Sequence, residues 1–149
     1  MDITNQKQLN TLLRAELESY INIAGARVWK LIDDSIKQYY DNYEPSKYKR
    51  EYQFFQSCIK TQPKWAGNTV TVEVYIDYDS MIYKPKDKDD RRPSGKEVVD
   101  WANVGLHGGL DVGDEHRVWD DPIEELDRGE VFADIISILR AHGFTVVRT

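Results

Sequence analysis

Apolar side chains recur at steps of three and four residues along the N-terminal part of the chain. They are Leu9, Leu13, Leu17, Tyr20, Ile21, Ala24, Val28, Leu31, Ile32, Ile36 and Tyr39. This spacing keeps one face of an α-helix apolar, and Thr4 or Asn5 provides an N-terminal cap. The pattern predicts one long helix over residues 5–42, about 55 Å long at roughly 1.5 Å per residue. Two shorter helices folded on one core are the alternative, with a kink or a close contact at Gly25.

Strict alternation of apolar and polar residues marks a strand in the middle of the chain. The inward positions are Val70, Val72, Val74 and Ile76. A turn-forming run at Ala66–Asn68 precedes this strand, and residues 57–65 form its partner, in which Pro63 indicates a sheet edge. Residues 57–78 are therefore predicted to form an antiparallel β-hairpin.

A proline separates the long helix from the hairpin. Pro45 ends the helix, because the residue before a proline avoids the α conformation and proline has no N–H to donate. A second, short helix is predicted over residues 46–56, where Tyr48, Tyr52 and Phe55 share one face.

Loops and two short helices are predicted after the hairpin. A charged loop is predicted at 84–96, followed by a helix at 97–104 that begins near Ser94 or Gly95 and stops at Gly105. Residues 105–121 are predicted to be irregular. A helix at 130–142 stops at Gly143, and an edge strand follows at 144–148. The charged loop is interpreted either as a solvated excursion or as an insertion that reaches a neighbouring subunit.

The element order predicts an α+β fold in a single domain over residues 1–149, with a long N-terminal helix, a small antiparallel sheet containing a central hairpin, and a flanking C-terminal helix.

Of the 149 residues, 31% are charged and 40% hydrophobic, which is typical of a folded, soluble protein. The net charge of −6 argues against a surface that binds nucleic acid throughout. Cys58 is the one cysteine, so we expect a reducing compartment and a core role for it. Neither a membrane span nor a signal peptide is predicted.

Basic and aromatic residues alternate in the segment 43–65. They include Lys47, Tyr48, Lys49, Arg50, Tyr52, Phe54, Phe55, Lys60, Lys64 and Trp65. Such a segment can bind single-stranded nucleic acid, because bases stack on the rings while the cations neutralise phosphates. The helical spacing instead groups the rings with one another, which favours a packed corner. A binding module for single strands or for a regulatory partner is therefore the alternative function.

One loop contains four residues of the types that bind divalent metals. They are His107, Asp111, Asp114 and His116. Their spacing matches no established ligand motif, and Asp and Gly are also the residues that turns require. A small metal-dependent hydrolase on residues 107–116 is therefore a third hypothesis. The favoured interpretation has no catalytic residue, no metal site and no cofactor, so we do not expect an enzyme.

The segment between the long helix and the hairpin also carries a spaced motif. It reads Tyr43-x-Pro45-x-x-Tyr48-x-Arg50, then Phe54 or Phe55, then Ser57-x-Ile59, with a valine-rich strand from Val70 to Asp77. This pattern resembles the head–tail joining, or tail-completion, proteins in the neck of tailed bacteriophages, over about residues 20–80. The chain departs from that family at Glu51, where threonine is usual, at the two phenylalanines, where leucine is usual, and in the loop at 84–96.

The resemblance implies an α+β subunit without catalysis that forms a ring, commonly of six copies, on the head connector or the head-proximal end of the tail. Its partners would be copies of itself, connector or head-closure proteins and tail-tube proteins, with DNA met only in passing. The protein would reside in the virion after assembly in the host cytoplasm. Subunit contacts are predicted at Tyr39, Tyr52, Phe54, Phe55 and Trp65. We also predict that Arg50 pairs with Asp77 or Asp79 and pins helix to sheet.

Overall fold

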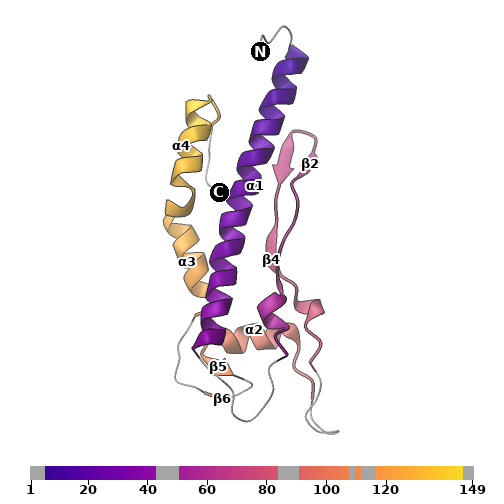
Figure 1. Ribbon diagram of the computed structural model, residues 1–149, viewed down its shortest axis with the longest axis vertical. Coiled ribbons are helices and arrows are strands. Elements are labelled where there is room, and N and C mark those ends of the chain that lie inside the picture. The colour runs from indigo at the N-terminus through magenta and orange to yellow at the C-terminus, as the bar shows by residue number, and fades with distance from the viewer. Residues whose placement is uncertain (1–5, 43–50, 84–90, 108–109, 112–116, 146–149) are drawn as a thin grey trace.

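The computed structural model describes residues 6–42, 51–83, 91–107, 110–111 and 117–145. The chain has the predicted α+β fold, with a long N-terminal helix, small antiparallel sheets and C-terminal helices (Figure 1). The helices are α1 (Gln6–Asp41), α2 (Gly95–Asn103), α3 (Asp120–Arg128) and α4 (Ala133–Ala141). The strands are β1 (Cys58–Lys60), β2 (Lys64–Ala66), β3 (Thr69–Thr71), β4 (Val74–Ile76), β5 (Leu106–His107) and β6 (Leu110–Asp111). Short 3₁₀ turns are η1 (Phe54–Gln56), η2 (Tyr78–Ser80) and η3 (Glu130–Phe132).

Helix α1 is continuous over its 36 residues, which confirms the single long helix and excludes two shorter ones. It is about 54 Å long at roughly 1.5 Å per residue and runs along the long axis of the molecule (Figure 1). One face of its C-terminal half is buried, with Ile32, Ile36 and Tyr39 each at most 6% exposed. Its N-terminal half is more open, and Leu12 is 37% exposed. The other elements therefore cover only part of this helix.

The hairpin forms as predicted, in two antiparallel ladders separated by a short gap. Strand β1 pairs with β4, with Cys58 opposite Ile76, and β2 pairs with β3, with Trp65 opposite Val70. The turn at Gly67–Asn68 joins β2 to β3, and its glycine has a φ of 60°. The hairpin lies along one side of α1, and α3 and α4 lie along another side (Figure 1).

The main core lies at the C-terminal end of α1, where this helix meets η1 and the β1–β4 ladder. Its buried apolar residues are Ile32, Ile36, Tyr39, Phe54, Cys58, Ile76, Met81, Val99, Ala102 and Val118. Helix α2 closes this core and begins at a capping box near the predicted start. Ser94 Oγ accepts the N–H of Glu97, and the Glu97 carboxylate accepts the N–H of Ser94. Gly105 follows the helix with a φ of 76°, as expected of a helix stop.

The short helix predicted over residues 46–56 is wrong in the part that the structure describes. Residues 51–53 precede a single 3₁₀ turn at Phe54–Gln56. Tyr52 has a φ of 55°, and this left-handed conformation interrupts a helix at that point. Tyr52 and Phe55 pack against Tyr40 of α1 without forming the predicted helix, and Tyr48 lies outside the described residues.

The C-terminal half differs from the prediction in its details. Helix α3 is missing from the prediction, because Ile123 and Leu126 are too few apolar residues to form a visible stripe. The region 105–121 is not wholly irregular, since it contains β5 and β6. The charged loop ends at Ser94 rather than residue 96, because α2 starts at Gly95.

The last helix was predicted over residues 130–142, and α4 begins three residues later and ends one residue earlier, with His142 as its C-cap. A φ of 79° at Gly129 ends α3, and η3 then precedes α4. Gly143 stops α4 with a φ of 82°, and the N–H of Phe144 donates to the carbonyl oxygen of Leu139 at 3.0 Å. Residues 144–145 are not in a strand, and the rest of the edge strand predicted at 144–148 lies outside the described residues.

Candidate subunit interface

The structure describes only the second part of the sequence motif. Tyr43, Pro45, Tyr48 and Arg50 lie outside the described residues. The salt bridge of Arg50 with Asp77 or Asp79 therefore stays a prediction. In the structure, the carboxylate of Asp77 accepts a hydrogen bond from the N–H of Ser80 at 3.3 Å. Ser57 is fully buried and donates its hydroxyl proton to the carbonyl oxygen of Phe54 at 2.7 Å. The N–H of Asp77 donates to the carbonyl oxygen of Ser57 at 2.8 Å, so these two motif residues join η1 to the end of β4.

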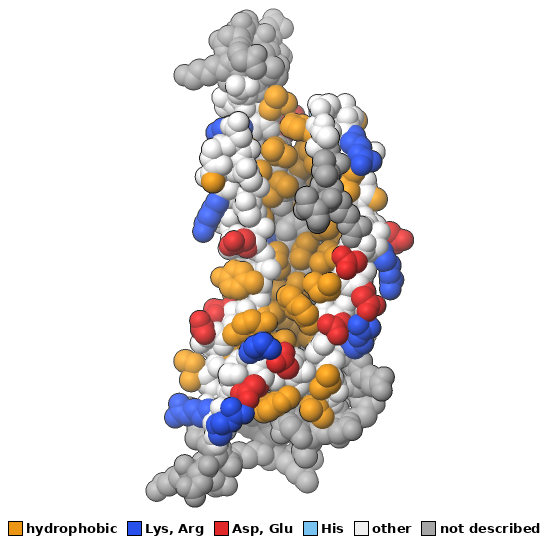
Figure 2. All heavy atoms as spheres, turned by 180° about the vertical axis from the view of Figure 1, so that it is seen from behind, with side chains coloured by type: hydrophobic (Ala, Val, Ile, Leu, Met, Phe, Trp, Pro, Cys, Tyr) orange, Lys and Arg blue, Asp and Glu red, His pale blue; other side chains and the backbone are white. Residues whose placement is uncertain are grey.

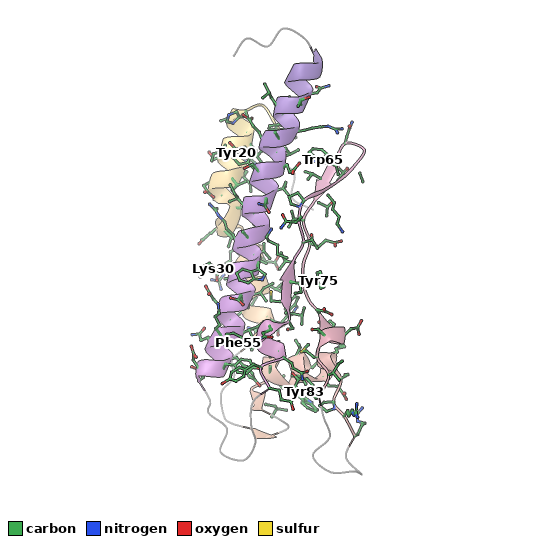
Figure 3. The ribbon with its side chains drawn as sticks, turned by 45° about the vertical axis from the view of Figure 1, so that its right-hand side comes forward. Tyr20, Lys30, Phe55, Trp65, Tyr75 and Tyr83 are labelled. Carbon is green, nitrogen blue, oxygen red and sulfur yellow. The ribbon has the colours of Figure 1, made fainter. Side chains whose placement is uncertain are left out.

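Aromatic rings gather where α1 meets η1, and we name this group the aromatic corner. Its members are Tyr39, Tyr40, Tyr52, Phe54 and Phe55. Tyr40 stacks on Tyr52 with ring centroids 5.6 Å apart, and Phe55 meets both rings edge-on. Tyr39 and Phe54 are 6% and 1% exposed, so within one chain they are core residues rather than contact residues. Tyr52 is 47% exposed and Phe55 is half-buried at the same corner (Figure 3), so the predicted subunit contact stays open for these two.

Trp65 holds the tip of the hairpin against α1 (Figure 3). Its indole N–H donates to the carboxylate of Glu18 at 2.9 Å. The guanidinium of Arg14 lies 4.7 Å from the centre of the indole ring and donates to the carbonyl oxygen of Gly67 at 2.9 Å. Trp65 thus has a structural role within the chain, and its predicted role between subunits remains a prediction.

Helix α4 is attached to α1 through Arg27. Its guanidinium donates to the Asp134 carboxylate, with 2.7 Å between Nη2 and Oδ2, and to the carbonyl oxygen of Val131 at 2.9 Å. The hydrogen bond from Arg27 lowers the pKa of Asp134 to about 2. Ile135 and Leu139 are buried on the same helix. The C-terminal helices are therefore held at a defined position beside α1.

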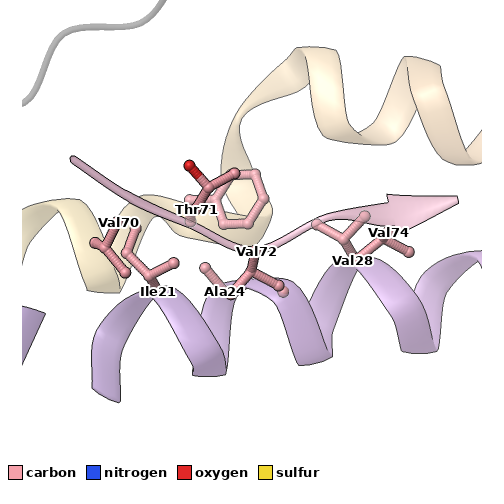
Figure 4. Close-up of a pocket in the computed structure, with 9 residues that line it drawn as sticks. Ile21, Ala24, Val28, Val70, Thr71, Val72 and Val74 are labelled. Carbon is pink, nitrogen blue, oxygen red and sulfur yellow. The ribbon is translucent and has the colours of Figure 1, made fainter. Parts of the chain in front are cut away.

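An open apolar groove of about 330 Å³ lies between the hairpin and the C-terminal helices, and we name it the valine groove. Its residues are Ile21, Ala24, Gly25 and Val28 of α1, Val70, Thr71, Val72 and Val74 of the hairpin, and Phe132 of η3. Figure 4 shows the hairpin strand lying over the α1 residues of the floor. None of the nine lining side chains is charged, and Figure 2 shows a band of apolar side chains along this face of the molecule. Apolar side chains that line an open groove can contact another protein, so the valine groove is a candidate interaction surface.

Helix α1 also extends beyond the elements that flank it, and we name its residues 6–13 the overhang. The hairpin tip reaches α1 at Arg14, and α4 ends where the ring of His142 lies 6.5 Å from that of Tyr20. Figure 1 shows the first turns of α1 projecting past both. Within the overhang Leu12 is 37% exposed and Leu13 is half-buried. The described part of the chain therefore has a projecting helix end as well as an open groove.

Neither the candidate metal ligands at 107–116 nor Cys58 forms a catalytic or metal site within the described residues. The side chains of His107, Asp111, Asp114 and His116 lie outside the description, and the described residues contain no group of three or more potential metal ligands. The metal hypothesis therefore stays untested. Burial, together with the charge of Asp33, raises the pKa of Cys58 to about 12. This thiol is protonated at neutral pH, which agrees with the predicted core role.

The described residues form an α+β protein with an open apolar groove, and its family places it among phage-derived proteins. The chain belongs to the YomN family, whose profile matches residues 5–141. No curated protein and no solved structure matches the chain. No described helix combines the length and hydropathy of a membrane span. The association with phage that the motif predicts is thus confirmed, whereas family membership does not specify a position in the neck.

Sequence reasoning missed the valine groove, although it identified both sides of it. The alternating pattern predicts Val70, Val72 and Val74 on the inward face of the hairpin, and the helical spacing places Ile21 and Val28 on the apolar stripe of α1. The sequence does not show that these two faces meet, or that space remains between them and Phe132. Both depend on where the hairpin lies on α1. Gly25, in the middle of the stripe, is the signal in the sequence that another element approaches α1 there.

Proposed function

We propose that this protein is a structural subunit of the phage neck, and that its copies form a ring that joins the head to the tail. The valine groove carries the proposal, because the described residues of the chain leave this uncharged surface open to solvent. Membership of the YomN family supports a phage role, and the motif that runs from Tyr43 to Ile59 supports the neck in particular.

The proposed mechanism is geometric and involves no catalysis. Each subunit presents one face to the connector and another to the tail tube, while neighbouring copies cover each other's apolar surface. A ring suits contacts of modest size, because every subunit in a closed ring is held by two neighbours. The aromatic corner, where the exposed Tyr52 stacks on Tyr40 near the C-terminal end of α1, offers a second surface for a phage partner.

A conditional allele tests the proposed function. A phage whose gene for this chain carries a nonsense codon is grown in suppressing and non-suppressing hosts, and particles are examined by electron microscopy. We expect filled heads and complete tails that fail to join without suppression, and joined particles with it. Mass spectrometry of purified wild-type virions should detect the chain in a small, fixed number of copies. Joined, infectious particles that lack the chain would refute the proposal.

A further inference from the structure

We propose that residues 146–149, which we name the tail, bind in the valine groove of their own chain as an extended third strand, and that a neighbouring subunit displaces them when it covers the groove. The displacement rests on the proposed ring-forming function. The binding of the tail depends only on the contacts within one chain.

The hairpin wall of the groove is an open strand edge. The N–H of Thr61 donates to the carbonyl oxygen of Glu73, and the N–H of Glu73 donates to the hydroxyl of Thr61, both at 2.9 Å. The backbone of Glu73 therefore points towards Thr61, and the alternation of an antiparallel ladder turns the N–H and C=O groups of Val72 and Val74 to the opposite side. The hairpin residues that line the groove lie within 70–74, away from β1 and β2. The open side of the strand thus faces the groove.

An extended segment fits beside this edge, whereas an α-helix does not. The hairpin strand lies on α1, with Val72 over Gly25, so an occupant must lie beside the strand, in the space of about 330 Å³ that Phe132 also lines (Figure 4). Neighbouring strands lie about 4.8 Å apart, whereas a helix with its side chains is about 10–12 Å wide. An added strand also forms hydrogen bonds with the open edge, which a helix cannot do.

The described chain ends beside one end of the groove. The ring of His142, which follows α4, lies 6.5 Å from the ring of Tyr20, and the next residue of α1, Ile21, belongs to the groove floor. Gly143 then has a φ of 82°, and the N–H of Phe144 donates back to the last turn of α4 at 3.0 Å. This arrangement ends a helix and redirects the chain. The tail therefore starts next to the groove.

The tail has the length that the groove requires. Contacts along α4 run backwards along α1, from Asp134 with Arg27 to His142 with Tyr20, so a chain that reverses after α4 runs from Tyr20 towards Val28. Val28, at the end of the groove floor, lies roughly 12 Å along α1 from Tyr20. The four tail residues span roughly 13 Å when extended.

The direction of the tail gives a parallel pairing. The hairpin strand runs along α1 in the order of the sequence, because Gly67 contacts Arg14 and Val72 contacts Gly25. A tail that runs towards Val28 has the same direction. Parallel strands need a long crossover connection, and the segment that contains α2, α3 and α4 provides it.

The side chains of the tail suit an uncharged groove. Val146 and Val147 carry no charge and are branched at Cβ, which favours strands. A charged side chain at their place would lose hydration without a partner, because none of the lining side chains is charged. Arg148 follows the two valines, so its charge falls towards the far end of the groove floor.

The tail and a neighbouring subunit compete for the same surface. Because the tail is tethered beside its site, its effective concentration there is on the order of millimolar. A free neighbour at a lower concentration does not displace it. Subunits that a connector holds side by side reach a comparable effective concentration and cover more surface. The tail thus keeps free subunits apart until assembly.

Disulfide trapping locates the tail. Glu73 is exposed on the strand beside the groove, and Glu73→Cys is combined in turn with Val146→Cys and with Val147→Cys. Consecutive residues of a strand point to opposite faces, so one of the two pairs should form its disulfide at least roughly tenfold faster than the other. The bridge should form within one chain, at a rate that dilution does not change. The matched control moves the first cysteine to Lys30, which is exposed on α1 outside the groove and should trap neither position.

Three results of the trapping experiment would overturn the proposal. Equal rates for the two tail positions would show that the segment lacks the alternation of a strand. Rates at Lys30 equal to those at Glu73, or no bridge in any pair, would show that the tail is not held in the groove. Bridges formed only between chains would show that the groove receives the tail of another copy.

Self-association tests the competition. A chain that ends after Thr145 lacks both the valines and the charge of Arg148, whereas Arg148→Ala removes only the charge. In sedimentation experiments the shortened chain should associate at least roughly tenfold more tightly than the full chain, and Arg148→Ala should behave like the full chain. No gain in the shortened chain, or an equal gain in both variants, would overturn the displacement step. Absence of the chain from virions would refute the neck function, yet leave the trapped position of the tail standing.

Discussion

A Cβ atom added to Gly25 would lie 2.4 Å from Cγ1 and 3.3 Å from Cβ of Val72. The hairpin strand therefore rests directly on the backbone of α1. Valine is branched at Cβ and has restricted χ1 rotamers, so its methyl group cannot readily turn away. This contact explains a glycine at a mid-helix position, where it costs roughly 1 kcal/mol relative to alanine.

Gly25→Ala is therefore expected to lower the free energy of unfolding by about 1–3 kcal/mol, because overpacking outweighs the gain in helix propensity. Urea denaturation measures the change. Gly25→Ala combined with Val72→Ala should be less destabilised than the sum of the two single variants, since the second change makes room for the first. Ala26→Gly, at an exposed neighbouring position, gives the effect of propensity alone. A stabilised Gly25→Ala variant would contradict the close contact.

The link between Arg27 and Asp134 predicts a pH dependence. The Asp134 pKa is about 2 in the folded protein, chiefly through the hydrogen bond from Arg27, against about 4 when unfolded. Because the folded pKa is the lower one, the contact stabilises the fold above about pH 4, and this stabilisation is lost as the pH falls towards 2. The carboxyl resonance of Asp134 in an NMR titration measures the pKa. Arg27→Gln should return it towards 4, and an unchanged value would contradict the pairing.

The capping box of α2 predicts a measurable loss of stability. Ser94→Ala removes the hydroxyl that accepts the N–H of Glu97 and should lower the free energy of unfolding by about 1 kcal/mol. Ser137→Ala is the matched control, because Ser137 is exposed within α4, where alanine favours the helix by a few tenths of a kcal/mol. Thermal or chemical denaturation of both variants compares the two serines, and equal effects would argue against the cap.

Burial of Cys58 predicts a thiol that reacts slowly. With a pKa of about 12, raised by burial and by the charge of Asp33, it has almost no thiolate at pH 8. Labelling of the native protein by a thiol reagent at pH 8 should be at least a hundredfold slower than in urea, as roughly estimated from the thiolate fraction. A cysteine at exposed Thr69 is the control and should react at once. Rapid labelling of native Cys58 would contradict its place in the core.

Local signals in the sequence predicted the parts of the fold that depend on neighbouring residues. The apolar stripe of α1, the alternation from Val70 to Ile76, the cap at Ser94 and the stop at Gly143 are all properties of short segments. Helix α3 was not predicted because Ile123 and Leu126 are too few to form a visible apolar stripe, and its contacts with η3 and α1 are not visible in the sequence.

The sequence identifies the aromatic residues of the candidate interface without showing which of them the chain buries. Phe54 lies in the core while Tyr52, two residues away, is exposed, because the left-handed backbone of Tyr52 turns the chain between them. No periodic pattern predicts that turn.

The sequence by itself determined a long amphipathic helix, a valine-rich hairpin and a motif associated with phage, since each depends on residues close together in the chain. Only the tertiary structure decided that the hairpin and Phe132 leave a groove over Gly25, and that α1 projects past both of its neighbours. The reason is that docking of the hairpin depends on contacts such as Arg14 with Gly67, between residues more than 50 positions apart. Such distant contacts leave no periodic signal in the sequence.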